Sequence, residues 1–182
     1  MPFFNPFRKI SESIRRMAEE NERIACYTAM SAEELRELDD AGLIDAATAR
    51  INGIIREKNE LMRAILELKP EQQVFYFVQN YVSQLESGGL WQYFADSSRR
   101  NVPYLPCALE KIGAAEHLAL FQSFTEANHI DLNDPINFST FDMRKFEENG
   151  STAFSVYDRE YRRLPPLSDF LAAYIRHNID AF

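Results

Sequence analysis

The apolar residues of this chain recur at helical spacing along almost its whole length. A first stripe near the N-terminus, with Asn21 as its one polar interruption, consists of Ile10, Ile14, Met17 and Ile24. A second stripe keeps the a and d spacing of a heptad repeat and is broken only by Lys58. It predicts one continuous helix over residues 44–68, with a length of roughly 36 Å.

Local signals mark where several helices begin and end. Ser31 followed by Glu34 has the spacing of a capping box, which predicts a short helix that ends near residues 40–42. Pro70 closes the heptad helix, because the residue before a proline is pushed out of the α region. The next helix, over residues 71–86, is apolar around most of its circumference, which is typical of a central, buried helix.

The remaining segments are also helical in pattern. Gly88 and Gly89 predict a helix stop, and a second buried segment follows at residues 90–94. Gly113 fits the position just after a helix that passes through Leu109. Further helices are predicted over residues 114–128, around Arg144, through Phe154, Tyr157 and Tyr161, and over residues 167–175, with a loop at 129–142.

The chain is therefore predicted to be all-α, with a compact helical core and an N-terminal helical arm or hairpin. We place the arm at residues 1–69 and the core at residues 70–182. Two arrangements of the arm remain open. In one it packs on the chain's own core or folds back as a hairpin, and in the other it pairs with a second copy to form a homodimer.

Composition and charge narrow the class of protein. The apolar fraction of 46% and the aromatic fraction of 13% indicate a packed core. The net charge of −8 disfavours direct binding to nucleic acid, because an acidic surface repels phosphate, and it favours a basic protein partner. Neither a signal peptide nor a membrane-spanning run is visible, so we expect a cytoplasmic protein with no membrane contact. Cys26 and Cys107 are expected to be buried, reduced thiols.

No catalytic constellation emerges from the sequence. The histidines lack the spacing of a zinc site, and neither a nucleophile elbow nor a phosphate-binding loop is present. Cys107 with His117 or His129 is the best nucleophile and base pair that can be drawn, but the apolar neighbours of Cys107 favour plain burial. We therefore expect no catalytic residue, no metal and no cofactor, and an unrecognised enzyme is the less favoured alternative.

Acidic residues concentrate in two parts of the chain. One is residues 33–45, where only Arg36 opposes six acids, and the other is residues 116–142. Between Lys111 and Arg144 no lysine or arginine occurs. We take the acids of this segment, with the next two along the chain, as candidate partner-binding residues: Glu116, Glu126, Asp131, Asp134, Asp142, Glu147 and Glu148. Such a set is either an ordinary solvated surface or a docking surface for a basic patch.

One stretch resembles the signature of a known family. The sequence of residues 85–98 is LESGGLWQYFADSS, and its motif residues are Gly88, Gly89, Gln92, Tyr93, Phe94 and Ser97. It is similar to the Asn-Gly-Gly-Phe-x-Gln-Tyr-Phe-x-Asn-Ser run of a largely uncharacterised bacterial helical domain family. Two further segments, at residues 108–114 and 171–177, also fit, so the resemblance covers about residues 70–182. Ser87, Leu90 and Asp96 depart from the usual run.

The resemblance implies an all-helical fold without known catalysis. The family includes a DNA-mimic protein, which binds a helix-turn-helix repressor in place of DNA. We expect Gly88 and Gly89 to set a helix end, and Gln92 and Tyr93 to satisfy backbone groups buried there. The favoured function is that of a non-enzymatic, acidic protein-binding domain. The alternative is a DNA mimic that occupies the DNA-binding surface of a transcription regulator.

Overall fold

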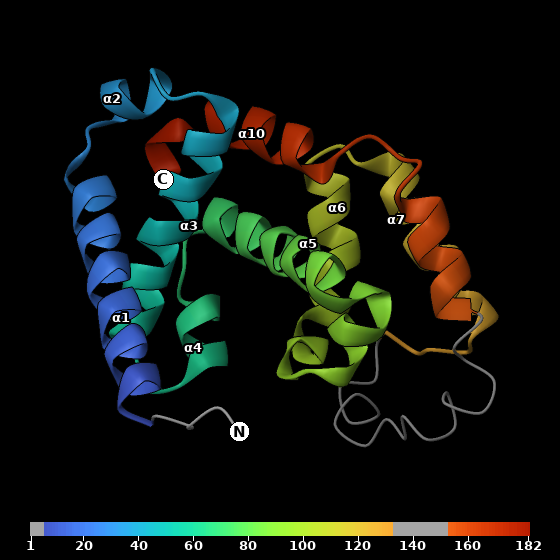
Figure 1. The fold of residues 1–182 in the computed structure, drawn as a ribbon. Coiled ribbons are helices and arrows are strands. Elements are labelled where there is room, and N and C mark those ends of the chain that lie inside the picture. The colour runs from blue at the N-terminus through green and yellow to red at the C-terminus, as the bar shows by residue number, and fades with distance from the viewer. Residues whose placement is uncertain (1–5, 133–152) are drawn as a thin grey trace.

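The computed structural model describes residues 6–132 and 153–182, and within these ranges the chain forms helices and no strand. The all-α prediction is therefore confirmed. In chain order the elements are α1 (Pro6–Ala29), α2 (Ala32–Arg36), α3 (Asp40–Arg56), α4 (Leu61–Leu66), α5 (Pro70–Ala95), the 3₁₀ helix η1 (Ser97–Tyr104), α6 (Leu105–Lys111), α7 (Ala115–Ala127), a helix over 153–161, α10 (Leu167–His177) and the 3₁₀ helix η2 (Ile179–Ala181) (Figure 1). None of the described helices is long and apolar enough to cross a membrane.

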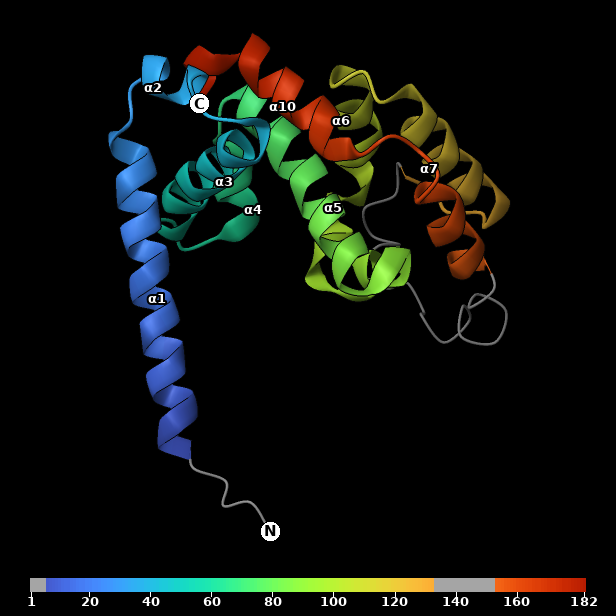
Figure 2. The same cartoon turned by 45° about the horizontal axis from the view of Figure 1, so that its top comes forward.

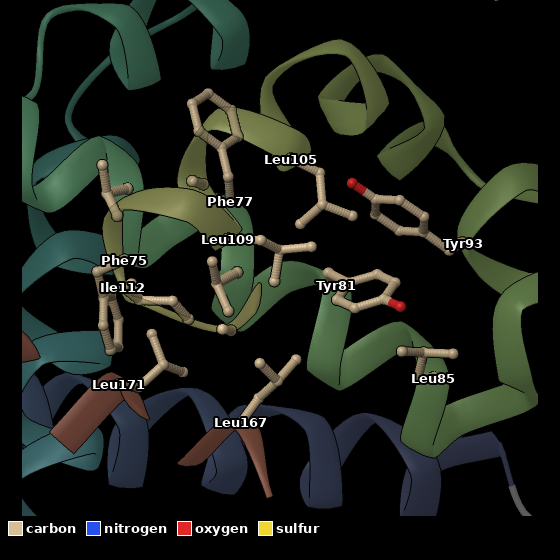
Figure 3. Packing of buried hydrophobic residues seen from close by; sticks show 14 of the residues in the cluster. Phe75, Phe77, Tyr81, Leu85, Tyr93, Leu105, Leu109, Ile112, Leu167 and Leu171 are labelled. Carbon is tan, nitrogen blue, oxygen red and sulfur yellow. The ribbon is translucent and has the colours of Figure 1, made fainter. Parts of the chain in front are cut away.

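Helix α5 forms the centre of the molecule, as its near-continuous apolar sequence predicts. It packs against η1, α6, α10, α3 and α4. Phe75, Val78 and Tyr81 are almost completely buried along it, and Figure 3 shows side chains of α6 and α10 closing over the same cluster. Burial of this apolar surface is the main favourable contribution to folding, at roughly 25 cal/mol per Å².

The N-terminal helices are joined to this core mainly through α3. On one side α3 packs against α1, and on the other it packs against α10. Two arginines strengthen these contacts. Arg176 on α10 pairs with Asp40 at the start of α3 at 2.7 Å and also donates to the carbonyl oxygen of Leu38 at 2.9 Å. Arg50 on α3 donates to the carbonyl oxygens of Tyr27 at 2.6 Å and Phe182 at 2.8 Å.

The heptad stripe over residues 44–68 forms two helices and not the single helix predicted. Instead of one helix over residues 44–68, α3 ends at Arg56 and α4 begins at Leu61. The four polar residues between them, starting at Glu57, interrupt the apolar repeat. The break lets α4 pack against both α3 and α5 and bury Ile65 completely. A straight continuation of α3 would not turn these residues back onto α5.

The boundary before α3 also needs correction. The capping box of Ser31 and Glu34 is present, but α2 ends at Arg36. Asp39 then caps α3 by accepting the backbone N–H of Gly42 at 2.8 Å. Gly42 therefore lies in the first turn of the next helix and does not terminate the previous one.

The expectation of two buried cysteines is wrong, because both are exposed. In α6, Leu105, Ala108 and Leu109 face the core at helical spacing, and Cys107 falls outside that stripe. Cys26 likewise lies next to the inward-facing Ile24, on the solvent side of α1.

The C-terminal end of α7 is closed by a residue that is unusual for its conformation. His129 has a φ of 54°. Its N–H donates to the carbonyl of Glu126 at 3.1 Å, and the N–H of Ile130 donates to that of Thr125 at 2.8 Å. This is the Schellman arrangement, in which glycine is the usual residue at the left-handed position.

We expect His129→Gly to raise the free energy of unfolding by about 0.5–1 kcal/mol, because glycine adopts this conformation without steric cost. The matched control is His177→Gly at the end of α10. His177 has a helical backbone, in which glycine is unfavourable, so this variant should lose a similar amount of free energy of unfolding. Urea unfolding of both variants measures the two changes. A loss of stability in His129→Gly would contradict the prediction.

Candidate protein-binding site

The glycine pair lies at a break within α5. Gly88 has φ −166° and ψ 19°, and Gly89 has φ 74° and ψ −172°, so neither is helical. The helix resumes at Leu90, whose N–H donates to Oδ1 of Asp158 at 2.8 Å. A carboxylate at the start of a helical segment satisfies an otherwise unpaired N–H and suits the local dipole.

Asp158 was not among the residues that the sequence singled out. It belongs to the helix over 153–161 and is separated from Leu90 by 68 positions in the sequence, so no local pattern indicates the contact. The structure therefore gives the capping role to Asp158 and not to Gln92 or Tyr93. The hydroxyl of Tyr93 is buried and has no hydrogen-bond partner among the described residues.

The break directs the signature aromatics into the core. Tyr93 and Phe94 are fully buried. The ring of Tyr93 meets that of Tyr81 edge-on with centroids 5.1 Å apart, and Phe94 stacks on Phe121 of α7 at 6.5 Å. Ser97 has a different place, at the surface, where its backbone N–H donates to the Asp96 side chain at 2.6 Å and begins η1.

Burial keeps the tyrosines of this core in their neutral form. It raises the pKa of Tyr81 and Tyr93 well above the usual value. Burial also raises the pKa of Tyr157, whose hydroxyl is hydrogen-bonded to that of Tyr81, and it raises the pKa of Tyr161 to about 12. These groups stabilise the fold as uncharged phenols and do not titrate near neutral pH.

The three residues considered for catalysis have ordinary structural settings. His117 is buried, and its Nε2 lies 2.8 Å from the carbonyl oxygen of Pro165, so this nitrogen carries the donated proton. Burial lowers the pKa of His117, which favours the neutral ring. His129 closes α7, and Cys107 lies at the surface of α6. No group of three His, Cys, Asp or Glu residues that could hold a metal occurs in the described part of the chain.

A shallow apolar groove lies between α7 and the helix over 153–161. Its volume is about 260 Å³, and it is lined by Leu120, Ser123, Phe124, Ala127, Asn128, Ala153, Val156, Tyr157 and Glu160. The two helices run side by side (Figures 1 and 2) and are joined by Phe124, whose ring lies 5.3 Å from that of Tyr157. Val156 remains 41% exposed at the groove, which is high for a large apolar side chain.

Three of the seven candidate acids lie within the described residues. Glu116 and Glu126 are exposed on α7, and Asp131 is exposed just after it. Glu126 adjoins the groove residue Ala127. On the opposite side Glu160 pairs with Arg163 at 2.7 Å. The four remaining candidates, Asp134, Asp142, Glu147 and Glu148, lie outside the described residues.

The comparison with known families identifies the domain. The model of the DMP19-like protein family matches residues 66–178. This chain belongs to the DMP19-like family. The match covers more than half of the chain, and it confirms the resemblance seen in the signature around Gly88. No curated protein and no solved structure gives a significant match.

Both features of the site lie within the family domain. The break at Gly88 and Gly89, its cap Asp158 and the groove of α7 all fall between residues 66 and 178. Helices α1, α2 and α3 precede the matched residues. The signature residues thus support the shared helical core, whereas α7 presents an accessible surface built on that core.

Proposed function

We propose that this protein acts without catalysis, by binding a protein partner in the groove between α7 and the helix over 153–161. The observation that carries the proposal is the exposed Val156 on an apolar groove, beside a helix that has acidic but no basic residues. Protein interfaces commonly combine an apolar centre with a polar rim.

The charges on the α7 side of the groove indicate the kind of partner. Glu116 and Glu126 give α7 a negative outer surface, with no lysine or arginine in the helix, whereas the other side of the groove has the exposed Arg159, Arg162 and Arg163. A partner segment with one or two apolar side chains flanked by basic residues would complement the α7 side. Its apolar contact should tolerate salt, whereas the charged rim should mainly affect the rate of association.

We expect Val156→Asp to weaken partner binding at least tenfold, because the new carboxylate would be buried at the centre of the contact without a partner. The measurement has two steps: affinity capture identifies proteins that bind the wild-type chain, and titration with the purified partner then gives the dissociation constants. Leu66→Asp on α4 is the matched control, since Leu66 is 49% exposed and lies outside the groove. Equal binding by Val156→Asp and wild type would place the interface elsewhere.

Membership of the DMP19-like family favours a second candidate, DNA mimicry. In that case the partner would be a DNA-binding regulator, and its contact would be made by the acids. Glu116 and Glu126 are ten residues apart on α7, so they span about 15 Å, over which duplex DNA presents about nine charges. The acids of α7 alone are therefore much sparser than phosphates.

A competition experiment separates the two candidates. Under mimicry, duplex DNA should displace the chain from its partner, and Glu116→Lys with Glu126→Lys should abolish binding together with its steep salt dependence. Under groove binding, DNA should not compete and Val156→Asp should have the larger effect. A hydrolase or transferase activity that disappeared on replacing Cys107, His117 or His129 would contradict both.

A further inference from the structure

The N-terminal half of α1 has an apolar stripe that nothing in the described part of the chain covers. The polar contacts that join α1 to α3 in the described residues lie on the C-terminal half of α1: Arg23 pairs with Asp45 at 2.5 Å, and Arg50 donates to the Tyr27 carbonyl at 2.6 Å. By contrast, Ile14 is 58% exposed and Met17 is 54% exposed. Figure 2 shows this half of α1 projecting away from the other helices.

The other half of the same helix borders a groove. The groove has a volume of about 640 Å³ and lies between α1 and α3, with Ile24, Ala25, Thr28, Gly53, Ile54 and Phe182 among its lining residues. Small side chains keep it open, and a Cβ added at Gly53 would approach Ile24 to 3.0 Å. The groove is thus mainly apolar, with Asn21, Arg50, Glu57 and Gln72 among its polar lining residues. Its lining follows α1 from Asn21 to Ala29, as a docking site for another helix would.

The exposed apolar stripe of α1 could fill the groove between α1 and α3, but both belong to the same helix. They share a single stripe, in which Ile14, Met17, Asn21, Ile24 and Thr28 follow at alternating steps of three and four residues. A rigid helix cannot fold its own N-terminal half back onto its C-terminal half. A second copy, related by a twofold axis near the middle of α1, would bring each projecting half into the groove of the other chain.

Charge along α1 points to the same antiparallel arrangement. The first half has Arg8, Lys9, Arg15 and Arg16 against one acid, Glu12, whereas the second half has Glu19, Glu20 and Glu22 against one base, Arg23. The first turn contains no acid and the last turn contains no base. This order is opposite to the one that stabilises an isolated helix through its dipole. The ion pairs Arg15–Glu19 and Arg23–Glu20 within α1 balance only part of it.

We propose that α1 mediates homodimerisation by pairing antiparallel with α1 of a second copy, with each N-terminal half seated in the α1–α3 groove of the other chain. The antiparallel pair places the basic half of each helix beside the acidic half of the other. A parallel pair would place like charges together and leave both grooves vacant. This interface is separate from the groove of α7, so it does not depend on the proposed function.

Sedimentation of the full chain over a range of concentrations tests the dimer. We expect wild type to dimerise and Ile14→Glu with Met17→Glu to raise the dissociation constant at least a hundredfold. Because both side chains are exposed, the melting temperature of the diluted, monomeric protein should not change. Val156→Glu, also at an exposed apolar position, is the control and should remain dimeric. A monomeric wild type at all concentrations would overturn the proposal.

A charge exchange tests the pairing of the two halves. Arg15→Glu with Arg16→Glu makes both halves of α1 acidic, and Glu19→Arg with Glu22→Arg makes both halves basic. Each variant alone should be mainly monomeric, whereas an equimolar mixture should form a heterodimer. If each variant dimerised as well as wild type, or if the mixture did not associate, the charge complementarity would be refuted.

Thiol cross-linking tests the direction of the pair. Ala18 lies next to the midpoint of α1, so in a Cys107→Ser background an Ala18→Cys chain should form a disulfide with its copy. Cys26 lies about 12 Å further along each helix, so it should not cross-link to its own copy in an antiparallel pair. Efficient formation of a Cys26 disulfide would indicate a parallel pair and overturn the arrangement.

Discussion

Replacing Gly89 with alanine should lower the free energy of unfolding by about 4 kcal/mol, which would lower the melting temperature by about 10 °C. Gly89 has φ 74° and ψ −172°, a region that is open essentially only to glycine and costs other residues about 1–3 kcal/mol. An added Cβ would also lie 2.2 Å from Oδ2 of Asp158. The carboxylate must then move, and the cap on Leu90 is lost at a further cost of about 1.5–3 kcal/mol.

The matched control is Gly113→Ala. Gly113 has a similar φ of 77°, but an added Cβ meets nothing within 4 Å. Its replacement should therefore cost only about 1 kcal/mol, the conformational part of the effect. Urea unfolding followed by circular dichroism gives both values. Equal losses at the two glycines would show that the contact with Asp158 does not matter.

A double-mutant cycle separates the two contributions at Gly89. Asp158→Ala alone should cost about 2 kcal/mol, because the N–H of Leu90 loses its acceptor. In that background Gly89→Ala should cost less than in wild type, since the collision with the carboxylate is gone. Additive losses would contradict the direct contact. Gly88 has a milder constraint, because an added Cβ would meet Cβ of Gln92 at 2.9 Å and its φ is extended.

Raising the pH above about 10 should destabilise the fold steeply. Burial raises the pKa of Tyr81, Tyr93 and Tyr157 above the value of about 10 that they have in the unfolded chain. Below pH 10 these phenols are protonated in both states, so their contribution to stability is complete. Between pH 10 and the folded-state pKa the unfolded chain releases protons that the folded chain keeps, and stability falls as pH rises.

The expected change in the free energy of unfolding per pH unit follows from the number of protons released. Each of the three buried tyrosines contributes about 1.4 kcal/mol per pH unit, so the total approaches about 4 kcal/mol per unit above pH 10. Urea unfolding at several pH values between 8 and 11.5 measures it. Tyr157→Phe removes one titrating group and should reduce the slope by about a third.

Spectroscopy of the folded protein provides an independent check. The chain has eight tyrosines, and the absorbance of tyrosinate reports how many of them ionise before unfolding. We expect the buried tyrosines to ionise only together with the loss of helical circular dichroism. Reversible ionisation of all eight near pH 10 in a folded chain would contradict the raised pKa values.

The sequence by itself determined the local features of this fold. Apolar spacing at 3.6 residues depends on neighbours along the chain, so the central position of α5 and the stripe of α10 could be predicted. The capping box of Ser31 and the helix end at Gly113 are likewise local, since their hydrogen bonds join residues three to five apart. The signature around Gly88 was sufficient to indicate the family.

Only the tertiary structure decided features that depend on residues distant in the sequence. The cap on Leu90 comes from Asp158, and no local pattern connects the two. The break after Arg56 and the exposure of Cys107 depend on which sides of α3, α4 and α6 meet α5, which periodicity alone does not specify. The same holds for the groove of α7: Phe124 and Val156 have similar apolar character, but packing buries the first and leaves the second at the surface.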